Sequence, residues 1–143
     1  MQNLSTERSI IIDAPVANIW DVLINPEKIA QYSFGSQVET DWQPGGPITF
    51  SRTSDGKHYE DKGQILEVIP EQLLKFSYWS SQEGYPDIPE NYSVISYNLE
   101  KVNVRGMNLT YRREKIPTAF EQKNQEQFLP FMLENMKRLA EQQ

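Results

Sequence analysis

The stretch FLPFMLENMKRLAEQQ, residues 128–143, decides which fold this chain can adopt. At 3.6 residues per turn its apolar side chains fall in one continuous arc of roughly 140°, and charged and amide side chains fill the opposite side. The pattern predicts a helix that buries one face against a large apolar surface. The apolar arc consists of Phe128, Leu129, Met132, Leu133, Met136, Leu139 and Ala140.

The surface beneath this helix must come from the preceding segments, most of which alternate between apolar and polar residues as β-strands do. The Asp55-Gly56 pair is typical of a tight hairpin turn between two of these strands. The longest segment cannot run straight, and Gly63 is the position where a bulge is expected. Strands are predicted over residues 7–13, 37–42, 48–52, 57–69, 74–78, 95–99 and 107–113.

Two short helices are predicted between the first two strands. Pro15 suits a first helical position because its missing N–H is not needed there, and apolar residues follow at helical spacing. This helix ends before Asn25-Pro26, and Asn25 can cap a second helix opened by Pro26. Ile29 and Tyr32 are predicted to face inward from that second helix.

The order of these elements is one strand, two short helices, six strands and one long helix. Six consecutive strands joined by hairpins form an antiparallel meander, and only the last helix has enough apolar area to cover it. The sequence therefore predicts an α+β fold in a single domain, residues 1–143, in which an antiparallel sheet of about seven strands wraps around a long C-terminal helix. Residues 120–127 form either a separate helical turn or an exposed lead-in, and Pro130 marks a helix start or a kink.

Composition excludes several classes of protein. The chain has 143 residues, of which 38% are hydrophobic and 24% charged, as in a soluble globular protein. A net charge of −6 with scattered bases argues against a nucleic-acid partner, because phosphate binding depends on Lys and Arg. No apolar run approaches the roughly 20 residues of a membrane span. Residues 1–8 lack a signal-peptide pattern and cysteine is absent, so we expect a cytoplasmic location.

Four segments together resemble a known family. They are IDAPV at residues 12–16 with Trp20, VETDW at 38–42 followed by Gly45-Gly46, GQILEVIPE at 63–71, and LKFSY at 74–78. In this order and spacing the chain resembles the helix-grip fold of the START and Bet v 1-like (SRPBCC) superfamily. More narrowly, it resembles the family named for the activator of heat-shock-protein-90 ATPase, homologue-like. The likeness spans nearly the whole chain.

The resemblance implies a hydrophobic cavity between the sheet and the last helix. It does not imply one activity, because the superfamily includes lipid carriers, hormone receptors, polyketide cyclases and chaperone activators linked to stress response. A Gly-Trp pair usually begins the packed part of the last helix in this family, and Phe128-Leu129 stands there instead. This departure implies a different shape for one wall of the cavity.

Aromatic residues and methionines recur on the strand faces predicted to point inward. Three phenols are among them, and a buried Tyr hydroxyl normally requires a partner. Arg52 and Arg113 are in phase with the same face, so each must pair, reach water at a strand end or meet an anionic ligand. The residues predicted to line a ligand cavity are Trp42, Phe50, Arg52, Phe76, Tyr78, Tyr97, Met107, Leu109, Tyr111, Phe128, Met132 and Met136.

Catalytic and metal sites receive little support from the sequence. His58 is the one histidine, and its place beside a hairpin turn predicts solvent exposure rather than catalysis. Glu60 and Asp61 are adjacent on a strand and so point to opposite faces. Since no cluster has metal-ligand spacing, we expect no catalytic residues, metal or cofactor.

Three functions remain open. The first is non-catalytic binding of a small hydrophobic or amphipathic molecule such as a lipid, with Arg52 or a tyrosine at its polar end and residues 80–91 as a gate. The second is a protein-interaction module that stimulates a chaperone ATPase. The third is a cyclase or hydrolase working inside the cavity. The expected partner is a small hydrophobic molecule under the first function and a chaperone under the second, with the chain a monomer or a homodimer.

Overall fold

One antiparallel sheet carries the architecture. The computed structural model describes residues 4–33 and 35–143, so residues 1–3 of the N-terminal stretch considered above lie outside the described part. Within it, seven strands follow the order β1-β7-β6-β5-β4-β3-β2. Neighbours from β2 to β7 are consecutive in the chain, which confirms the predicted meander, and β1 pairs with β7. The strands are β1 (Leu4–Asp13), β2 (Gln37–Thr40), β3 (Pro47–Ser54), β4 (Lys57–Ile69), β5 (Leu73–Ser80), β6 (Ser93–Lys101) and β7 (Gly106–Ile116).

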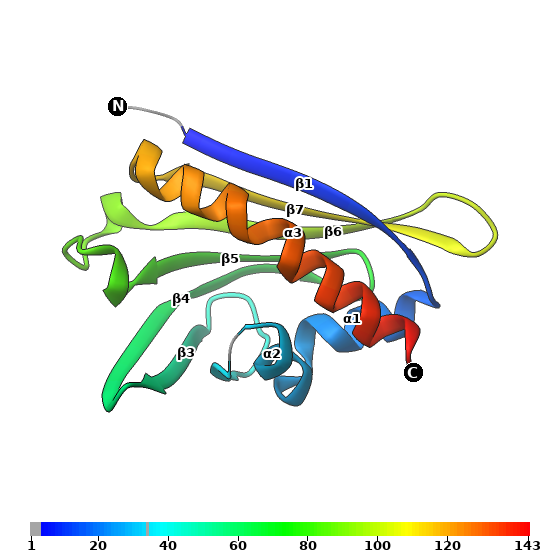
Figure 1. Cartoon of the computed structure of the whole chain (residues 1–143), viewed down its shortest axis with the longest axis horizontal. Helices are drawn as coiled ribbons and strands as arrows, with labels where there is room; N and C mark the ends of the chain where they lie inside the picture. Colours follow the sequence, from blue (N-terminus) through cyan, green and yellow to red (C-terminus); the bar gives the residue numbers. More distant parts are fainter. Residues whose placement is uncertain (1–3, 34) are drawn as a thin grey trace.

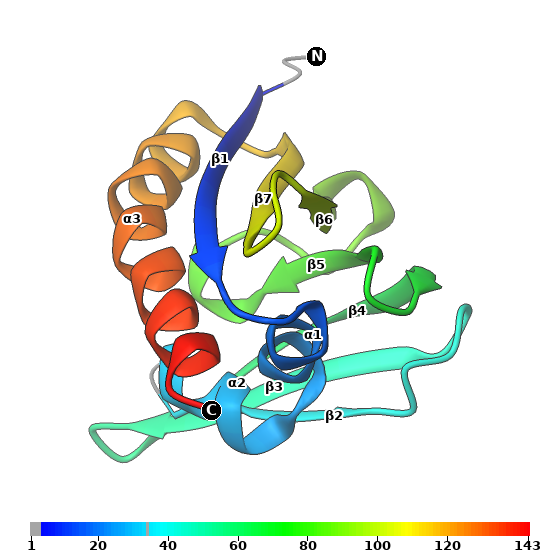
Figure 2. The same ribbon diagram turned by 90° about the vertical axis from the view of Figure 1, so that its right-hand side faces the viewer.

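The long helix α3 (Ala119–Glu141) crosses one face of the sheet (Figure 1), and the view at right angles shows it on one side of the strands (Figure 2). The Thr118 side chain caps its start by accepting from the Glu121 N–H at 3.2 Å. Residues 120–127 are therefore part of one continuous helix, and Pro130 lies inside it. The predicted apolar arc faces the core: Leu129, Met132, Leu133, Met136, Leu139 and Ala140 are all buried.

The two short helices, α1 (Val16–Ile24) and α2 (Pro26–Tyr32), follow β1 as predicted. The Asn25 side chain accepts from the Glu27 N–H at 3.0 Å, which caps α2. Ile29 and Tyr32 are buried. Both helices contact α3, so they close one end of the space between α3 and the sheet.

Two local details differ from the predictions. Strand β2 ends at Thr40, before Trp42, because Trp42 adopts a positive φ of 58° that a continuing strand does not allow. The register shift between β4 and β5 lies between Ile65 and Glu67, so the bulge is not at Gly63. Gly63 instead allows close approach: a Cβ there would lie 1.7 Å from the carbonyl oxygen of Ser77.

The connection from β5 to β6 is irregular and contains Gly84, Pro86 and Pro89. It holds two single turns of 3₁₀ helix, η1 (Ser81–Glu83) and η2 (Pro89–Asn91), and returns the chain to the same end of the sheet as the start of α3 (Figure 1). No helix in the described part of the chain is both long enough and apolar enough to cross a membrane.

Candidate functional site

A cavity of about 350 Å³ lies between the sheet and α3. Side chains from β3 to β7 form its floor, and α1, α2 and α3 supply the remaining walls. Exposed Gln82 and Asn124 are among the lining residues, so the cavity meets solvent where η1 faces the first turns of α3. The residues that were predicted as cavity lining and border this space are Trp42, Phe50, Arg52, Phe76, Tyr78, Tyr97, Tyr111, Phe128 and Met132.

Three residues predicted as cavity lining do not border it. Leu109 and Met136 have no exposed surface and belong to the solid core. Met107 borders a separate hollow near Asp13 and Lys101. Leu109 on β7 and Met136 on α3 belong to the buried core cluster, whereas Met107 is partly buried at its edge. Inward phase on a strand predicts burial there, not access to a void.

Aromatic rings form much of the cavity wall. The ring centroid of Phe50 lies 5.9 Å from that of Phe76 and 6.3 Å from that of Tyr78. Such tilted and edge-on contacts are favourable beyond the area they bury. The Thr40 side chain accepts from the Trp42 N–H at 3.2 Å, which helps to hold the turn that brings Trp42 to the cavity. The wall is therefore a connected set of rings on an ordered sheet.

Strand register separates an inner from an outer end of the cavity. Tyr97 and Tyr111 face each other across β6 and β7, with ring centroids 5.3 Å apart. Arg113 lies one pleat further along β7, on the same face and paired with Ile95. Tyr78 lies at the end of β5 that leads into η1. The arginine is consequently closer to the solvent-facing mouth than the two phenols are.

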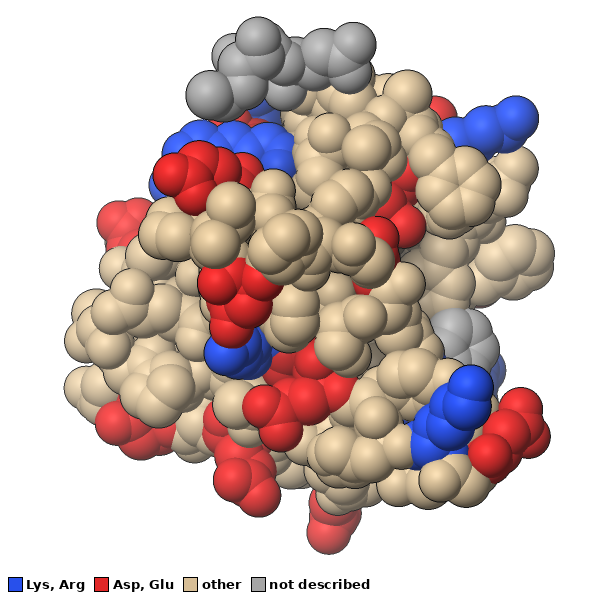
Figure 3. Space-filling model, turned by 90° about the vertical axis from the view of Figure 1, so that its left-hand side faces the viewer, with Lys and Arg blue, Asp and Glu red and all other residues tan. Residues whose placement is uncertain are grey.

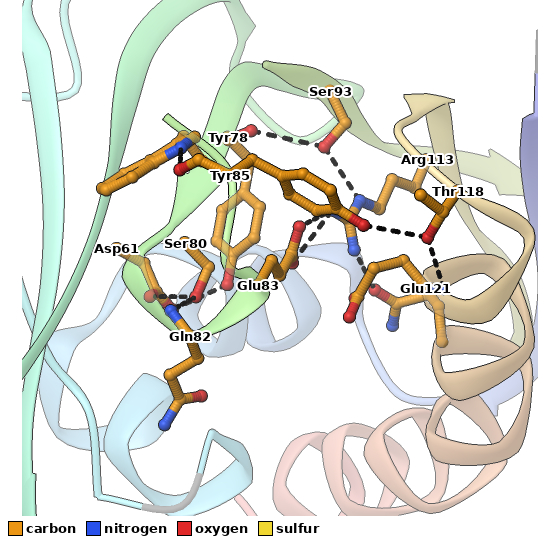
Figure 4. A network of polar contacts seen from close by, with 12 residues as sticks. Asp61, Tyr78, Ser80, Gln82, Glu83, Tyr85, Ser93, Arg113, Thr118 and Glu121 are labelled. Atoms are coloured by element: carbon orange, nitrogen blue, oxygen red, sulfur yellow. Dashed lines mark hydrogen bonds and ion pairs between the residues drawn. The ribbon is translucent and has the colours of Figure 1, made fainter. Parts of the chain in front are cut away.

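Arg113 is the centre of the outer end (Figure 4). Its side chain is only 3% exposed, and each nitrogen of the guanidinium has a partner. Nε donates to Ser93 Oγ at 2.8 Å, Nη1 donates to Gln125 Oε1 at 3.0 Å, and Nη2 lies 3.2 Å from both carboxylate oxygens of Glu83. The guanidinium also stacks 5.2 Å from the centroid of the Tyr78 ring. The sequence-based requirement that this arginine find a partner is thus met within the chain.

A second polar group adjoins this ion pair. Asp61 accepts hydrogen bonds from the Tyr78 hydroxyl and from Ser80 Oγ, each at 2.6 Å (Figure 4). Burial and the neighbouring carboxylate of Asp61 raise the pKa of Tyr78 well above its ordinary value. Tyr78 is therefore a neutral donor to Asp61 at physiological pH.

The pKa values of Glu83 and Arg113 are shifted by burial, by each other and by neighbouring groups. Burial raises the pKa of Glu83, the guanidinium of Arg113 lowers it, and Glu121 raises it again, so that the net shift is upward. Burial acts to lower the pKa of Arg113, but Glu83 and the nearby phenols outweigh it and raise that pKa. Figure 3 shows the end of the molecule at which α3 begins, where acidic side chains gather near the centre of the face. At the outer end, Asp61, Glu83 and Glu121 contribute carboxyl groups to the cavity lining.

Hydrogen bonds and an ion pair hold the turn η1 in place at the cavity mouth. Arg52 Nη2 donates to Gln82 Oε1 at 2.5 Å, so Arg52 reaches the mouth rather than the interior. Arg113 holds Glu83 from the other side. The Tyr85 hydroxyl lies 2.9 Å from Thr118 Oγ1, which joins the same segment to the first turn of α3 (Figure 4).

The family model described as "Activator of Hsp90 ATPase homolog 1-like protein" matches residues 13–141. The chain belongs to this family. The solution structure of ChR145 from Cytophaga hutchinsonii is similar at 36% identity, with a TM-score of 0.83 and coverage of 99% of this chain and 97% of that one. No protein with a curated description matches the sequence.

More distant solved structures share the fold of this Hsp90-activator-like chain. CV1439 from Chromobacterium violaceum has 17% identity and a TM-score of 0.80, with coverage of 96% of each chain. PFC0360w, an HSP90 activator from Plasmodium falciparum, has 16% identity and a TM-score of 0.65, with coverage of 81% of this chain and 76% of that one. At these identities the likeness concerns architecture alone.

Several lining residues of this family member were absent from the sequence-based list. Asp61 was missed because the faces of the first half of β4 could not be read past Gly63. Glu83 and Gln82 lie in an irregular turn where neither helical nor strand periodicity applies. Arg113 and Tyr32 carried a usable signal, since both were predicted to face inward.

The residues that sequence analysis weighed for catalysis do not come together in the cavity. His58 is exposed and lies outside the cavity. Ser80 donates directly to Asp61, without a histidine between them that could act as a base. Among residues 4–33 and 35–143, no group of three His, Cys, Asp or Glu side chains is arranged to hold a metal ion.

Proposed function

We propose that this chain binds a small hydrophobic or amphipathic molecule in the cavity between the sheet and α3, without transforming it. The observation that carries the proposal is the cavity itself, about 350 Å³ bordered mostly by aromatic and aliphatic side chains. Small-molecule sites typically measure 300–1,000 Å³ and combine apolar walls with a few placed polar groups. The volume and the wall chemistry here agree with that description.

The polar groups favour an amphipathic rather than a purely apolar ligand. Among the apolar side chains of the wall are several polar groups in fixed positions. They are the hydroxyls of Tyr97 and Tyr111, the Arg113–Glu83 ion pair and the carboxylate of Asp61. A wholly apolar ligand would leave some of these groups without hydrogen-bond partners, which costs free energy. The methionine on α3, Met132, gives that wall an adaptable side chain.

The test is a thermal-shift and native mass spectrometry screen with fatty acids and small aromatic compounds. A ligand at a hundredfold excess over its dissociation constant should stabilise the protein by about 2.7 kcal/mol. Met132→Trp fills the cavity and should abolish the shift, whereas Phe131→Trp should not, because Phe131 is 70% exposed on the outer side of the same helix. The proposal would be refuted if neither the fatty acids nor the aromatic compounds raised the melting temperature. It would also be refuted if a ligand raised it equally in both variants.

A second candidate function follows from family membership. The family description names activators of a chaperone ATPase, so stimulation of Hsp90 is the partner function to test. Acidic side chains on the face shown in Figure 3 could meet a basic surface of such a partner. An Hsp90 ATPase assay with and without this chain distinguishes the candidates, since Met132→Trp should leave chaperone stimulation unchanged.

A further inference from the structure

Three buried phenols border the cavity and have no hydrogen-bond partner among the described residues. Tyr32, Tyr97 and Tyr111 are 7%, 7% and 2% exposed, and all line the cavity. Their hydroxyls donate to no atom of the described residues. Tyr78, a partly buried phenol of the same cavity, is by contrast bonded to Asp61 at 2.6 Å. A buried hydroxyl normally has a partner, so these three require an explanation.

The three hydroxyls face open space. No buried side-chain nitrogen or oxygen of the described residues is both sealed from solvent and without a partner. An unpartnered hydroxyl on a buried tyrosine must therefore touch a void, and the void that all three rings line is the cavity. The donors of Tyr32, Tyr97 and Tyr111 are thus available to whatever occupies it.

The phenols are neighbours and stay protonated. The rings of Tyr97 and Tyr111 meet edge to face across adjacent strands, with centroids 5.3 Å apart. Burial, followed by the nearby phenols of Tyr32 and Tyr111, raises the pKa of Tyr97 well above its ordinary value. Burial likewise raises the pKa of Tyr32 and of Tyr111. Each hydroxyl is consequently a neutral donor over the whole physiological pH range.

The charge arrangement argues against an anionic ligand at this inner end. Arg113, the buried cation of the cavity wall, already holds both carboxylate oxygens of Glu83. The other cation of the lining, Arg52, bonds to Gln82 at the mouth. A ligand carboxylate beside the phenols would therefore be desolvated without a cation next to it, which is costly. An uncharged oxygen acceptor meets no such penalty, and a carbonyl oxygen can accept from two donors at once.

We propose that the cavity selects uncharged, mainly apolar molecules that carry a carbonyl oxygen, which accepts hydrogen bonds from Tyr97 and Tyr111, with Tyr32 as a third donor. The proposal rests on the ligand-binding function above and specifies its chemistry. The carbonyl lies at the inner end of the cavity, and the apolar body contacts the ring wall that includes Phe50 and Phe76.

A matched series of probes tests this selectivity: diphenylmethane, diphenylmethanol, benzophenone and diphenylacetate share an apolar body and differ in the polar group. Isothermal titration should show benzophenone binding at least about tenfold more tightly than diphenylmethane. Tyr97→Phe and Tyr111→Phe should each reduce that ratio by about three- to tenfold. Tyr92→Phe is the control, because Tyr92 bonds to Asp87 and does not border the cavity.

The infrared carbonyl stretch of ¹³C-labelled benzophenone gives a readout independent of affinity. Bound to the native protein it should lie at lower wavenumber than in hexane, and it should move back toward the hexane value in the Tyr97→Phe/Tyr111→Phe variant. Equal affinities for benzophenone and diphenylmethane, a hexane-like stretch, or tightest binding of diphenylmethanol or diphenylacetate would overturn the inference while leaving ligand binding intact. Failure of all four probes to bind would overturn this inference, and the proposed function would fall with it only if the fatty-acid and aromatic screen also showed no shift.

Discussion

The guanidinium of Arg113 lies 3.2 Å from both carboxylate oxygens of Glu83, and the two side chains are only 3% and 11% exposed. The pair joins β7, which forms part of the cavity floor, to η1, which lies at the cavity mouth. A buried ion pair is a weak source of stability when compared with apolar packing, but removing one partner leaves a buried charge alone. This asymmetry makes the pair testable.

Arg113→Met should destabilise the protein by about 3–5 kcal/mol, because the Glu83 carboxylate then loses its cation in a buried place. The double variant Arg113→Met/Glu83→Gln should be clearly more stable than the single one. Urea denaturation measures both free energies of unfolding. Arg112→Met is the matched control: Arg112 is 49% exposed and pairs with Glu114 at the surface, so its loss should cost less than about 1 kcal/mol. A single variant as stable as this control would contradict the prediction.

Glu121→Gln should lower the pKa of Glu83. Burial raises that pKa above its ordinary value of 4.5, and the carboxylate of Glu121 raises it further. Because the folded-state pKa is the higher one, the stabilisation from proton binding is complete below 4.5 and is lost as the pH rises through the shifted pKa. Because Glu121→Gln brings the folded-state pKa of Glu83 closer to 4.5, the free energy of unfolding should fall by less as the pH rises.

Carboxyl ¹³C NMR titration follows the pKa of Glu83 directly. Glu126→Gln serves as the control, because Glu126 is exposed on the same helix and has no part in the pair. A Glu83 titration that is identical in the native protein and in Glu121→Gln would show that Glu121 has no influence.

Removing a hydroxyl should affect stability differently at the two ends of the cavity. Tyr78→Phe deletes a donor to the partly buried carboxylate of Asp61 and should destabilise the ligand-free protein by about 1–3 kcal/mol, since the carboxylate loses a bond. Tyr97→Phe deletes a hydroxyl with no partner among the described residues, so the free energy of unfolding should change by less than about 0.5 kcal/mol. Thermal denaturation of both variants, without ligand, makes the comparison. Equal losses would mean that Tyr97 has a structural bond.

The sequence predicted the fold well because periodicity reports burial. The arc around Met136 and the alternation around Tyr97 each required a partner surface, and a meander covered by one helix is the arrangement that supplies both. The strand that was predicted to reach Trp42 ends earlier, because hydrogen bonds to Thr40 and Asp41 turn the chain there. Such side-chain turns leave no periodic signal.

The candidate site was only partly predictable, for a physical reason. Inward phase identifies residues that leave water, but it does not distinguish a filled core from a void: Tyr111 borders the cavity whereas Leu109, two residues earlier on the same face, is packed solid. The void depends on where α3 stands away from the sheet, which is a property of all the packed side chains together. Glu83, in an irregular turn, meets Arg113 only through the tertiary fold.

Gly63→Ala should destabilise the protein by about 1–3 kcal/mol or more, as forced overpacking does. A Cβ at this position would lie 1.7 Å from the Ser77 carbonyl oxygen and 2.5 Å from its carbonyl carbon, so β4 and β5 would have to move apart. Gly84→Ala is a contrasting variant, since its Cβ would meet nothing within 4 Å and only its positive φ of 80° opposes the change. Chemical denaturation should rank Gly63→Ala as the less stable, and the opposite ranking would argue against the close approach of β5.

Met132 and Met136 lie one helical turn apart on α3, and truncating them should have different consequences. Met136 is fully buried in the solid core, so Met136→Ala should cost about 2–5 kcal/mol through lost contacts and a new hole. Met132 already borders empty space, so Met132→Ala loses fewer contacts and should fall at or below the low end of that range, while enlarging the cavity. Denaturation curves give the stabilities, and binding of the diphenyl probes reports the cavity. If Met136→Ala changes probe binding as much as Met132→Ala does, the separation between core and cavity along α3 is incorrect.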